Sequence, residues 1–323
     1  MGEGAALMSE ERELLAETVA ALVTKHASPA AVRAAMESDR GYDESLWQLL
    51  CDQVGAAALV IPEELGGAGG ELGDAATVLQ ELGRALAPSP LLGTTLAELA
   101  LLAAPEPDAE TLEGLAGGSS IGALVLDPDY VLNGDIADVV VAAADGQLSR
   151  WTRFSVQPVA TMDPTRRLAR VRPEDTQAIG ADPGLADTAA ILLAAEQIGA
   201  AERCLELTVD YAKSRVQFGR PIGSFQALKH RMADLYVAIA AARAVVADAC
   251  DDPTPTNAAT ARLAACEALC TVAAEGIQLH GGIAITWEHD MHLYFKRAHG
   301  SAQLLGSPRE LLRRLESEVL QTP

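Results

Sequence analysis

The sequence predicts a mainly helical α+β fold in which a small β region separates two helical regions. The chain of 323 residues is 49% apolar but only 4% aromatic, and a core of Ala, Leu and Val suits close-packed helices better than stacked sheets. Helical periodicity marks residues 1–117 and 183–323, whereas short apolar runs between turn signals fill residues 118–182. We therefore expect an N-terminal helical domain, a small β domain and a C-terminal four-helix bundle with these boundaries.

The first region shows the apolar spacing of amphipathic helices. Apolar residues recur at helical turns in two stretches, first Leu14, Val19 and Leu22, then Leu46, Leu50 and Val54. A glycine-rich break over residues 61–70 follows. Two further helices are expected at about 72–87 and 91–104, so that this region is helical up to about residue 117.

The middle region changes to strand patterns. Apolar runs at 121–126, 139–142 and 154–159 alternate with turn signals such as Asp127-Pro128 and Asn133-Gly134. This pattern predicts a small β domain of four to six strands.

The last region is helical again. Two long helices are expected between residues 187 and 250, and a third over about 257–279 ends at Gly281-Gly282. The stretch Ser307-Pro308-Arg309-Glu310 combines a capping box with proline at the first helical position, and therefore predicts the start of a final helix.

Charge and cysteine content narrow the function classes. Lys and Arg total 24 against 45 Asp and Glu, a formal charge of −21, which disfavours nucleic acid and anionic membrane as partners. We expect no membrane-spanning stretch and no signal peptide in the first 30 residues. Cys266 and Cys270, four residues apart on an expected helix, are interpreted as small core residues and not as metal ligands. The expected location is the cytoplasm.

Two C-terminal segments carry distinctive motifs. The first reads Y-A-K-S-R-V-Q-F-G-R-P-I over 211–222 and continues G-S-F-Q-A-L-K-H to residue 230. The second reads Q-L-H-G-G-I over 278–283 and continues to W-E-H-D at 287–290 and K-R-A at 296–298. Together with the I-P-E-E-L-G-G-A-G-G turn at 61–70 and the helical–β–helical order, they resemble the acyl-CoA dehydrogenase family over nearly the whole chain.

The resemblance implies a site for FAD. In that family these two motifs reach across a subunit interface and hold the pyrophosphate and adenosine of the neighbour's cofactor. The residues so implied here are Arg215, Gln217, Phe218, Gln226, Gln278, Gly281 and Gly282. Arg215 offers a fixed fork of donors to phosphate oxygens, and the two glycines let backbone N–H groups approach an anion. The simpler alternatives are a surface ion pair for Arg215 and a helix C-cap for the glycines.

The catalytic base of the family is missing from both of its usual positions. Most members place a glutamate shortly after the K-R-A segment, where this chain has Leu305. Other members place it on the first long helix of the C-terminal domain, where this chain has Ala189, followed by Ala190 in the position of an arginine that serves the CoA ligand. Neither leucine nor alanine can accept a proton, so we expect no catalytic residue in this chain.

The β region also lacks the motifs that contact the flavin ring. The family's T-E-P-x-x-G-S-D motif does not survive in the corresponding residues 117–126, and Trp151 is interpreted as an ordinary strand aromatic. The chain therefore keeps the half of the site that serves a neighbour's FAD and lacks the half that would serve its own.

This asymmetry resembles the short subunit of heteromeric actinobacterial acyl-CoA dehydrogenases, many of which act on steroid-derived CoA thioesters. The resemblance implies a longer catalytic homologue as partner, an α2β2 assembly, and an acyl-CoA substrate bound mainly by that partner. Two alternatives stay open: a self-sufficient homo-oligomeric enzyme with a displaced glutamate base, and a flavin-free scaffold protein.

Two further acidic residues were candidates for a displaced base. Glu196 lies two turns beyond Ala189 and is interpreted as a polar helix residue at a subunit contact. Glu288 would share a helical face with His292 if that stretch is helical, and with His289 the cluster is interpreted as part of a subunit interface.

Overall fold

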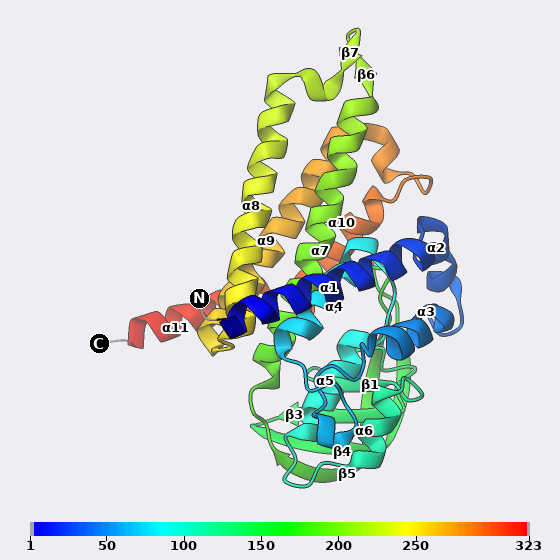
Figure 1. The fold of residues 1–323 in the computed structure, drawn as a ribbon, viewed down its shortest axis with the longest axis vertical. Coiled ribbons are helices and arrows are strands. Elements are labelled where there is room, and N and C mark those ends of the chain that lie inside the picture. Colours follow the sequence, from blue (N-terminus) through cyan, green and yellow to red (C-terminus); the bar gives the residue numbers. More distant parts are fainter. Residues whose placement is uncertain (1–2, 322–323) are drawn as a thin grey trace.

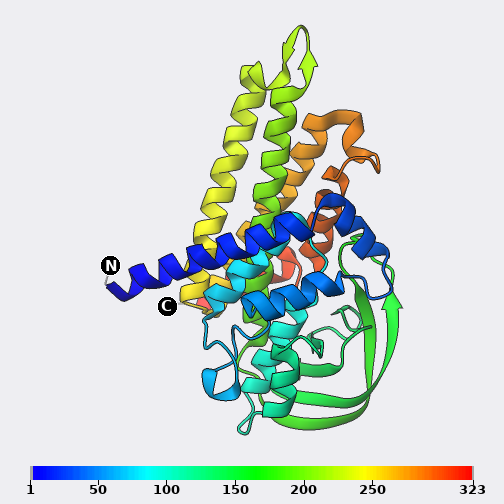
Figure 2. The ribbon, with the colours of Figure 1, turned by 45° about the vertical axis from the view of Figure 1, so that its right-hand side comes forward.

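The computed structural model describes residues 3–321 and shows a helical region, a sheet and a helical bundle in chain order (Figure 1). The N-terminal helices are α1 (Glu3–His26), α2 (Pro29–Glu37), α3 (Glu44–Leu49), α4 (Leu72–Ala85), α5 (Leu91–Leu102) and α6 (Ala109–Ala116). In both views α1 lies across α4 near the base of the bundle (Figure 1, Figure 2). The first expected domain boundary falls in the turn between α6 and the sheet.

The sheet has five strands, within the expected range of four to six. They are β1 (Gly122–Val125), β2 (Val131–Leu132), β3 (Val139–Ala144), β4 (Gln147–Val159) and β5 (Leu168–Ala181), in the spatial order β1-β3-β4-β5-β2. β1 pairs parallel with β3, and the other pairs are antiparallel. All four residues of β1 are buried, and α5 packs on this strand, where the Gly122 N–H donates to Thr94 Oγ1 at 3.2 Å. Trp151 is a buried strand aromatic opposite Val140.

The C-terminal region is a bundle built on three long helices. Its elements are α7 (Leu185–Ser214), β6 (Val216–Gln217), β7 (Arg220–Pro221), α8 (Gln226–Asp251), α9 (Pro255–His280), α10 (Met291–Gln303) and α11 (Pro308–Gln321). The β6–β7 hairpin forms the end of the bundle farthest from the sheet (Figure 1, Figure 2). The predicted capping box is present at the start of α11, where Ser307 N–H donates to Glu310 Oε2 at 2.8 Å.

Glycines fix the crossing of α4 and α7. A Cβ added to Gly199 would lie 1.8 Å from the Gln80 carbonyl oxygen, and one added to Gly83 would lie 2.1 Å from the Glu196 carbonyl oxygen. Only glycine permits such close backbone approach. The N-terminal region is therefore held closely against the stretch of α7 that contains Glu196 and Gly199.

The expectation that no stretch is long and apolar enough to span a bilayer is wrong as a statement of composition. The segment Pro255–Ile285 is long enough, and an 18-residue window within it has a mean hydropathy of 1.3. In the fold this segment is the central helix of the bundle, packed against α7, α8, α10 and α11. Its apolar character is explained by this packing, in which Cys266 is 4% exposed and belongs to the core.

Candidate functional site

The first cofactor motif forms an exposed hairpin at the end of α7. Arg215 follows the last residue of α7 in an extended conformation, and its carbonyl accepts from Ile222 N–H at 2.8 Å. Phe218 at the turn has a positive φ of 55° and is 92% exposed. Gln217 is exposed on β6, and Gln226 is exposed as the first residue of α8. Among the described residues Arg215 makes no ion pair, so its guanidinium is free to bind a ligand.

The second cofactor motif ends α9. Gln278 is exposed on the last turn, and Gly281 caps the helix with φ 68° and ψ −147°. The helix-cap alternative therefore describes what Gly281 does within the fold. A Cβ added to Gly281 or Gly282 would meet no atom within 4 Å, so the backbone here is open and an anion can reach its N–H groups.

Aromatic stacking brings the two motifs together at the same end of the bundle. The rings of Tyr211, one turn before Arg215, and His280, one residue before Gly281, stack with centroids 4.3 Å apart. All seven sequence-predicted residues thus lie exposed on two neighbouring segments. This arrangement suits a ligand that lies across the surface and is covered by a second subunit.

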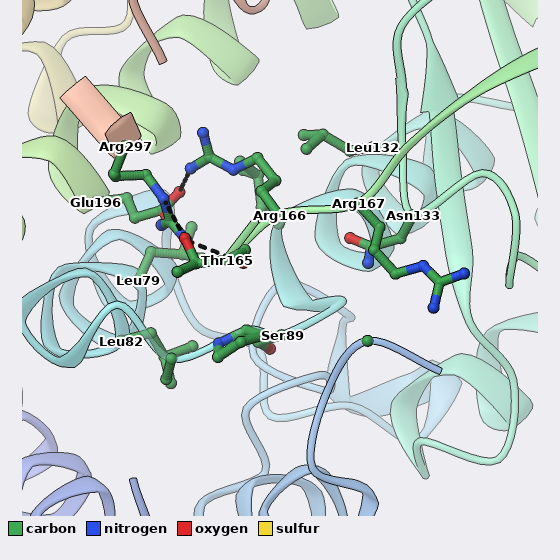
Figure 3. Close-up of a pocket in the computed structure, with 14 residues that line it drawn as sticks. Leu79, Leu82, Ser89, Leu132, Asn133, Thr165, Arg166, Arg167, Glu196 and Arg297 are labelled. Carbon is green, nitrogen blue, oxygen red and sulfur yellow. Dashed lines mark hydrogen bonds and ion pairs between the residues drawn. The ribbon is translucent and has the colours of Figure 1, made fainter. Parts of the chain in front are cut away.

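A second candidate site lies inside the chain, where α4, the β4–β5 connection, α7 and α10 meet (Figure 3). Arg297 of α10 donates through Nε to Asp163 Oδ2 at 2.7 Å and also bonds Thr165 and Glu196. Arg166 donates to the other oxygen of Glu196 at 2.7 Å. We call these five residues, Asp163, Thr165, Arg166, Glu196 and Arg297, the buried ion cluster.

The charges within the buried ion cluster compensate one another. Two carboxylates face two guanidinium groups, and Asp163 Oδ1 also accepts from Thr165 N–H at 3.0 Å. Burial, followed by the charge of Arg297, lowers the pKa of Arg166. Burial opposes the charge of Arg297 too, but Asp163 and Glu196 together raise its pKa. Glu196 thus has both carboxylate oxygens engaged by arginines of this chain.

The cluster leaves very little open space. The cavity beside it measures about 30 Å³, and its lining includes the leucines Leu79, Leu82 and Leu132 (Figure 3). Such a volume holds one or two water molecules. An acyl chain has no room there.

The positions of the missing base are apolar in the structure as well. Ala189 is fully buried, and Leu305 packs against the hydrophobic core with a positive φ of 57°. Asp187, the nearby carboxylate on α7, is bound to Arg314 at 2.6 Å.

Two sequence-based interpretations are corrected here. Glu196 is not at a subunit contact, because it is buried within this chain between two arginines. Glu288 shares no helical face with His292, because residues 286–290 form turns and α10 begins at Met291. Glu288 is exposed, whereas His292 is buried against Trp287.

The sequence reasoning did not anticipate the buried ion cluster. Asp163, Thr165 and Arg166 are close in the sequence, but their partners Glu196 and Arg297 lie 30 to 134 residues away, so no local pattern unites all five. One usable signal was the charge of Glu196 directly after the apolar stretch from Ala189 to Ala195.

Comparison with known proteins places this geometry in a family. Residues 9–119 match the description "Acyl-CoA dehydrogenase, N-terminal domain" and residues 185–318 match "Acyl-CoA dehydrogenase, C-terminal domain". The chain belongs to the acyl-CoA dehydrogenase family. Its mainly helical fold with a small sheet is the fold of this family, and a flavoprotein oxidoreductase acting on a CH–CH bond is the activity that membership supports.

Relatives within the family are similar over the full chain length. The acyl-CoA dehydrogenase IpdE2 of Mycobacterium tuberculosis is 84% identical over 314 residues, which cover 97% of this chain and 99% of that protein. The structure titled "Tcur3481-Tcur3483 steroid ACAD G363A variant" is 28% identical with a TM-score of 0.88, covering 97% of this chain and 99% of that one. A chain of the ChsE4-ChsE5 complex from Mycobacterium tuberculosis is 27% identical with a TM-score of 0.86, covering 97% and 98%.

Proposed function

We propose that this chain is the non-catalytic subunit of an FAD-dependent acyl-CoA dehydrogenase and completes the FAD site of a longer catalytic homologue. The observation that carries the proposal is the buried ion cluster, which leaves about 30 Å³ of cavity. It is built on α7 and α10, and the family's base is carried on α7 or shortly after α10. The cavity beside the cluster has no space for an acyl group, and both base positions hold apolar residues that cannot accept a proton.

The distal segments fit the ADP half of FAD. Arg215 is exposed without an ion pair among the described residues, and the Gly281–Gly282 backbone is open. In the proposed complex Arg215 and Gln217 bind the pyrophosphate, the glycine N–H groups approach the same anion, and Gln226 and Gln278 bond ribose or ring atoms. Phe218, which projects from the hairpin turn, packs against the partner.

The β region supports the same assignment of roles to this chain and its partner. The flavin, when bound, accepts hydride from the β carbon of the acyl group. In this chain the stretch that would contact its ring contains β1, whose four residues are buried against the chain's own core. We therefore assign the ring and the proton acceptor for the α carbon to the partner.

The similar structures support the proposed partner and substrate class. Two of them are of a paired steroid ACAD and of the ChsE4-ChsE5 complex. We propose an α2β2 assembly in the cytoplasm that desaturates a CoA thioester, of steroid origin, with the acyl group bound mainly by the partner.

Bleaching of the flavin on adding an acyl-CoA tests the assignment of the base. In the purified complex, Glu196→Gln and Glu288→Gln in this chain should leave bleaching intact, whereas replacing the partner's glutamate base should abolish it. Glu196→Gln also removes two ion pairs, so FAD content is measured in parallel. If either variant of this chain keeps its FAD but no longer bleaches, the self-sufficient enzyme with a displaced base is the correct reading.

A further inference from the structure

A column of rings connects the two segments proposed to hold FAD. Tyr211 and His280 stack with centroids 4.3 Å apart and planes 24° apart, and His289 lies edge-on to His280 at 4.6 Å. Tyr211 lies one helical turn before Arg215, and His280 directly precedes Gly281. The column therefore sets the distance between the arginine hairpin and the glycine turn.

Both imidazoles are placed so that only their neutral form fits. His280 is 4% exposed, its Nδ1 lies 2.8 Å from the Gly276 carbonyl, and its Nε2 has no hydrogen-bond partner within residues 3–321. With Nδ1–H donating to that carbonyl, Nε2 carries a lone pair, and a proton there would find no acceptor. His289 Nδ1 accepts from Met291 N–H at 3.1 Å, a bond that protonation would break. Burial lowers the pKa of both histidines.

The charged groups around the ring column would do little to stabilise a protonated histidine. Asp290 is a carboxylate whose charge acts on His289, and it is already paired with Arg33 of α2 at 2.7 Å. Arg33 also points a donor at the His289 carbonyl at 3.5 Å. His292 interacts with His289, and Lys296 acts in turn on His292. The phenol of Tyr211 lies edge-on to His289. A protonated His289 would therefore meet a second histidine, a neutral phenol and a carboxylate that already has a partner.

We propose that His280 and His289 are positioning residues for the ADP half of FAD, and that they hold the glycine turn against the arginine hairpin only as neutral imidazoles. This inference rests on the proposed function. It adds that acidification opens the ring column and weakens retention of the cofactor before the fold itself is lost.

The test is an FAD titration of the apo complex, with the partner present, at about pH 7.5 and about pH 5.5, on either side of the ordinary histidine range. The Kd of the wild-type complex should rise by about tenfold or more on acidification, as expected for coupling to one or more protons. His280→Phe keeps a stacking ring but cannot titrate, so its Kd should change much less. His289→Asn keeps an acceptor for Met291 N–H without a titrating ring, and should also flatten the profile. His299→Gln, which replaces an exposed histidine of α10, is the matched control and should behave as wild type.

Equal pH dependence in wild type and both column variants would overturn the inference, as would a loss of FAD that only accompanies loss of helical circular dichroism. If His280→Phe does not assemble, His289→Asn alone decides. A complex that binds no FAD at about pH 7.5 contradicts the proposed function itself, whereas one that binds FAD with an unaltered profile contradicts only this inference.

Discussion

Replacing Arg297 by methionine should lower the unfolding free energy of the complex by about 3–5 kcal/mol, the scale for removing one partner of a buried ion pair. Arg297 is 2% exposed and bonds Asp163, Thr165 and Glu196. Without it, among the described residues the Asp163 carboxylate keeps only the bonds that it accepts from the Thr165 N–H and hydroxyl, and Glu196 keeps only Arg166. Methionine fills part of the volume but cannot compensate either charge.

Urea denaturation of the complex at fixed protein concentration measures this loss. Arg153→Met is the matched control, because the Arg153 side chain is 70% exposed and its nearest carboxylate lies 3.9 Å away; its effect should stay within about 0.5 kcal/mol. Adding Glu196→Gln to Arg297→Met should recover part of the loss, since it removes one of the uncompensated charges. A loss below about 1 kcal/mol for Arg297→Met would refute the view that the cluster is a coupled buried network.

Three further outcomes are expected. Arg215→Ala should weaken FAD binding in the complex by about 1.5–3 kcal/mol, the scale of a charge-assisted hydrogen bond. Equilibrium dialysis measures this loss, with Arg153→Ala as the control. The preference of the complex among acyl-CoA substrates should hardly change. Glu98 is fully buried without a hydrogen-bond partner within the described chain, and burial raises its pKa well above the usual value. The folded state therefore holds the proton of Glu98 more tightly than the unfolded state does. The protein should lose stability as the pH rises above about 4.3, the usual pKa of a glutamate. Glu98→Leu should therefore flatten this part of the urea-midpoint profile and stabilise the protein by about 1–3 kcal/mol at neutral pH, whereas an unchanged profile would show that the carboxyl is solvated. Leu305→Glu should create no second active site, because this chain provides no flavin-ring platform, and a doubled bleaching amplitude would contradict that.

Local patterns in the sequence were sufficient for much of the fold. Apolar periodicity predicted the long helices, and Ser307 with Glu310 marked the start of α11 because a capping box depends on residues three apart. The strand runs between turn signals predicted a sheet of about the right size. The seven cofactor residues came from motif resemblance, and their binding role stays a prediction.

Features that depend on tertiary packing were not predictable. Glu196 was interpreted as a residue at a subunit contact, because the sequence does not show that Arg166 and Arg297 bind it in the folded chain. A shared helical face for Glu288 and His292 failed because the chain turns before α10 begins at Met291. Likewise, α9 is apolar because other helices of the bundle pack on several of its sides. Hydropathy alone cannot distinguish a helix surrounded by protein from one surrounded by lipid.

The FAD content of purified protein tests the central claim most directly. Expressed alone, the chain should be colourless or insoluble, because the flavin-ring contacts are absent from its β region. Co-expressed with its longer homologue, it should yield about one FAD per heterodimer, since each cofactor then draws donors from both chains. A yellow, soluble homo-oligomer of this chain carrying one FAD per subunit would contradict the account.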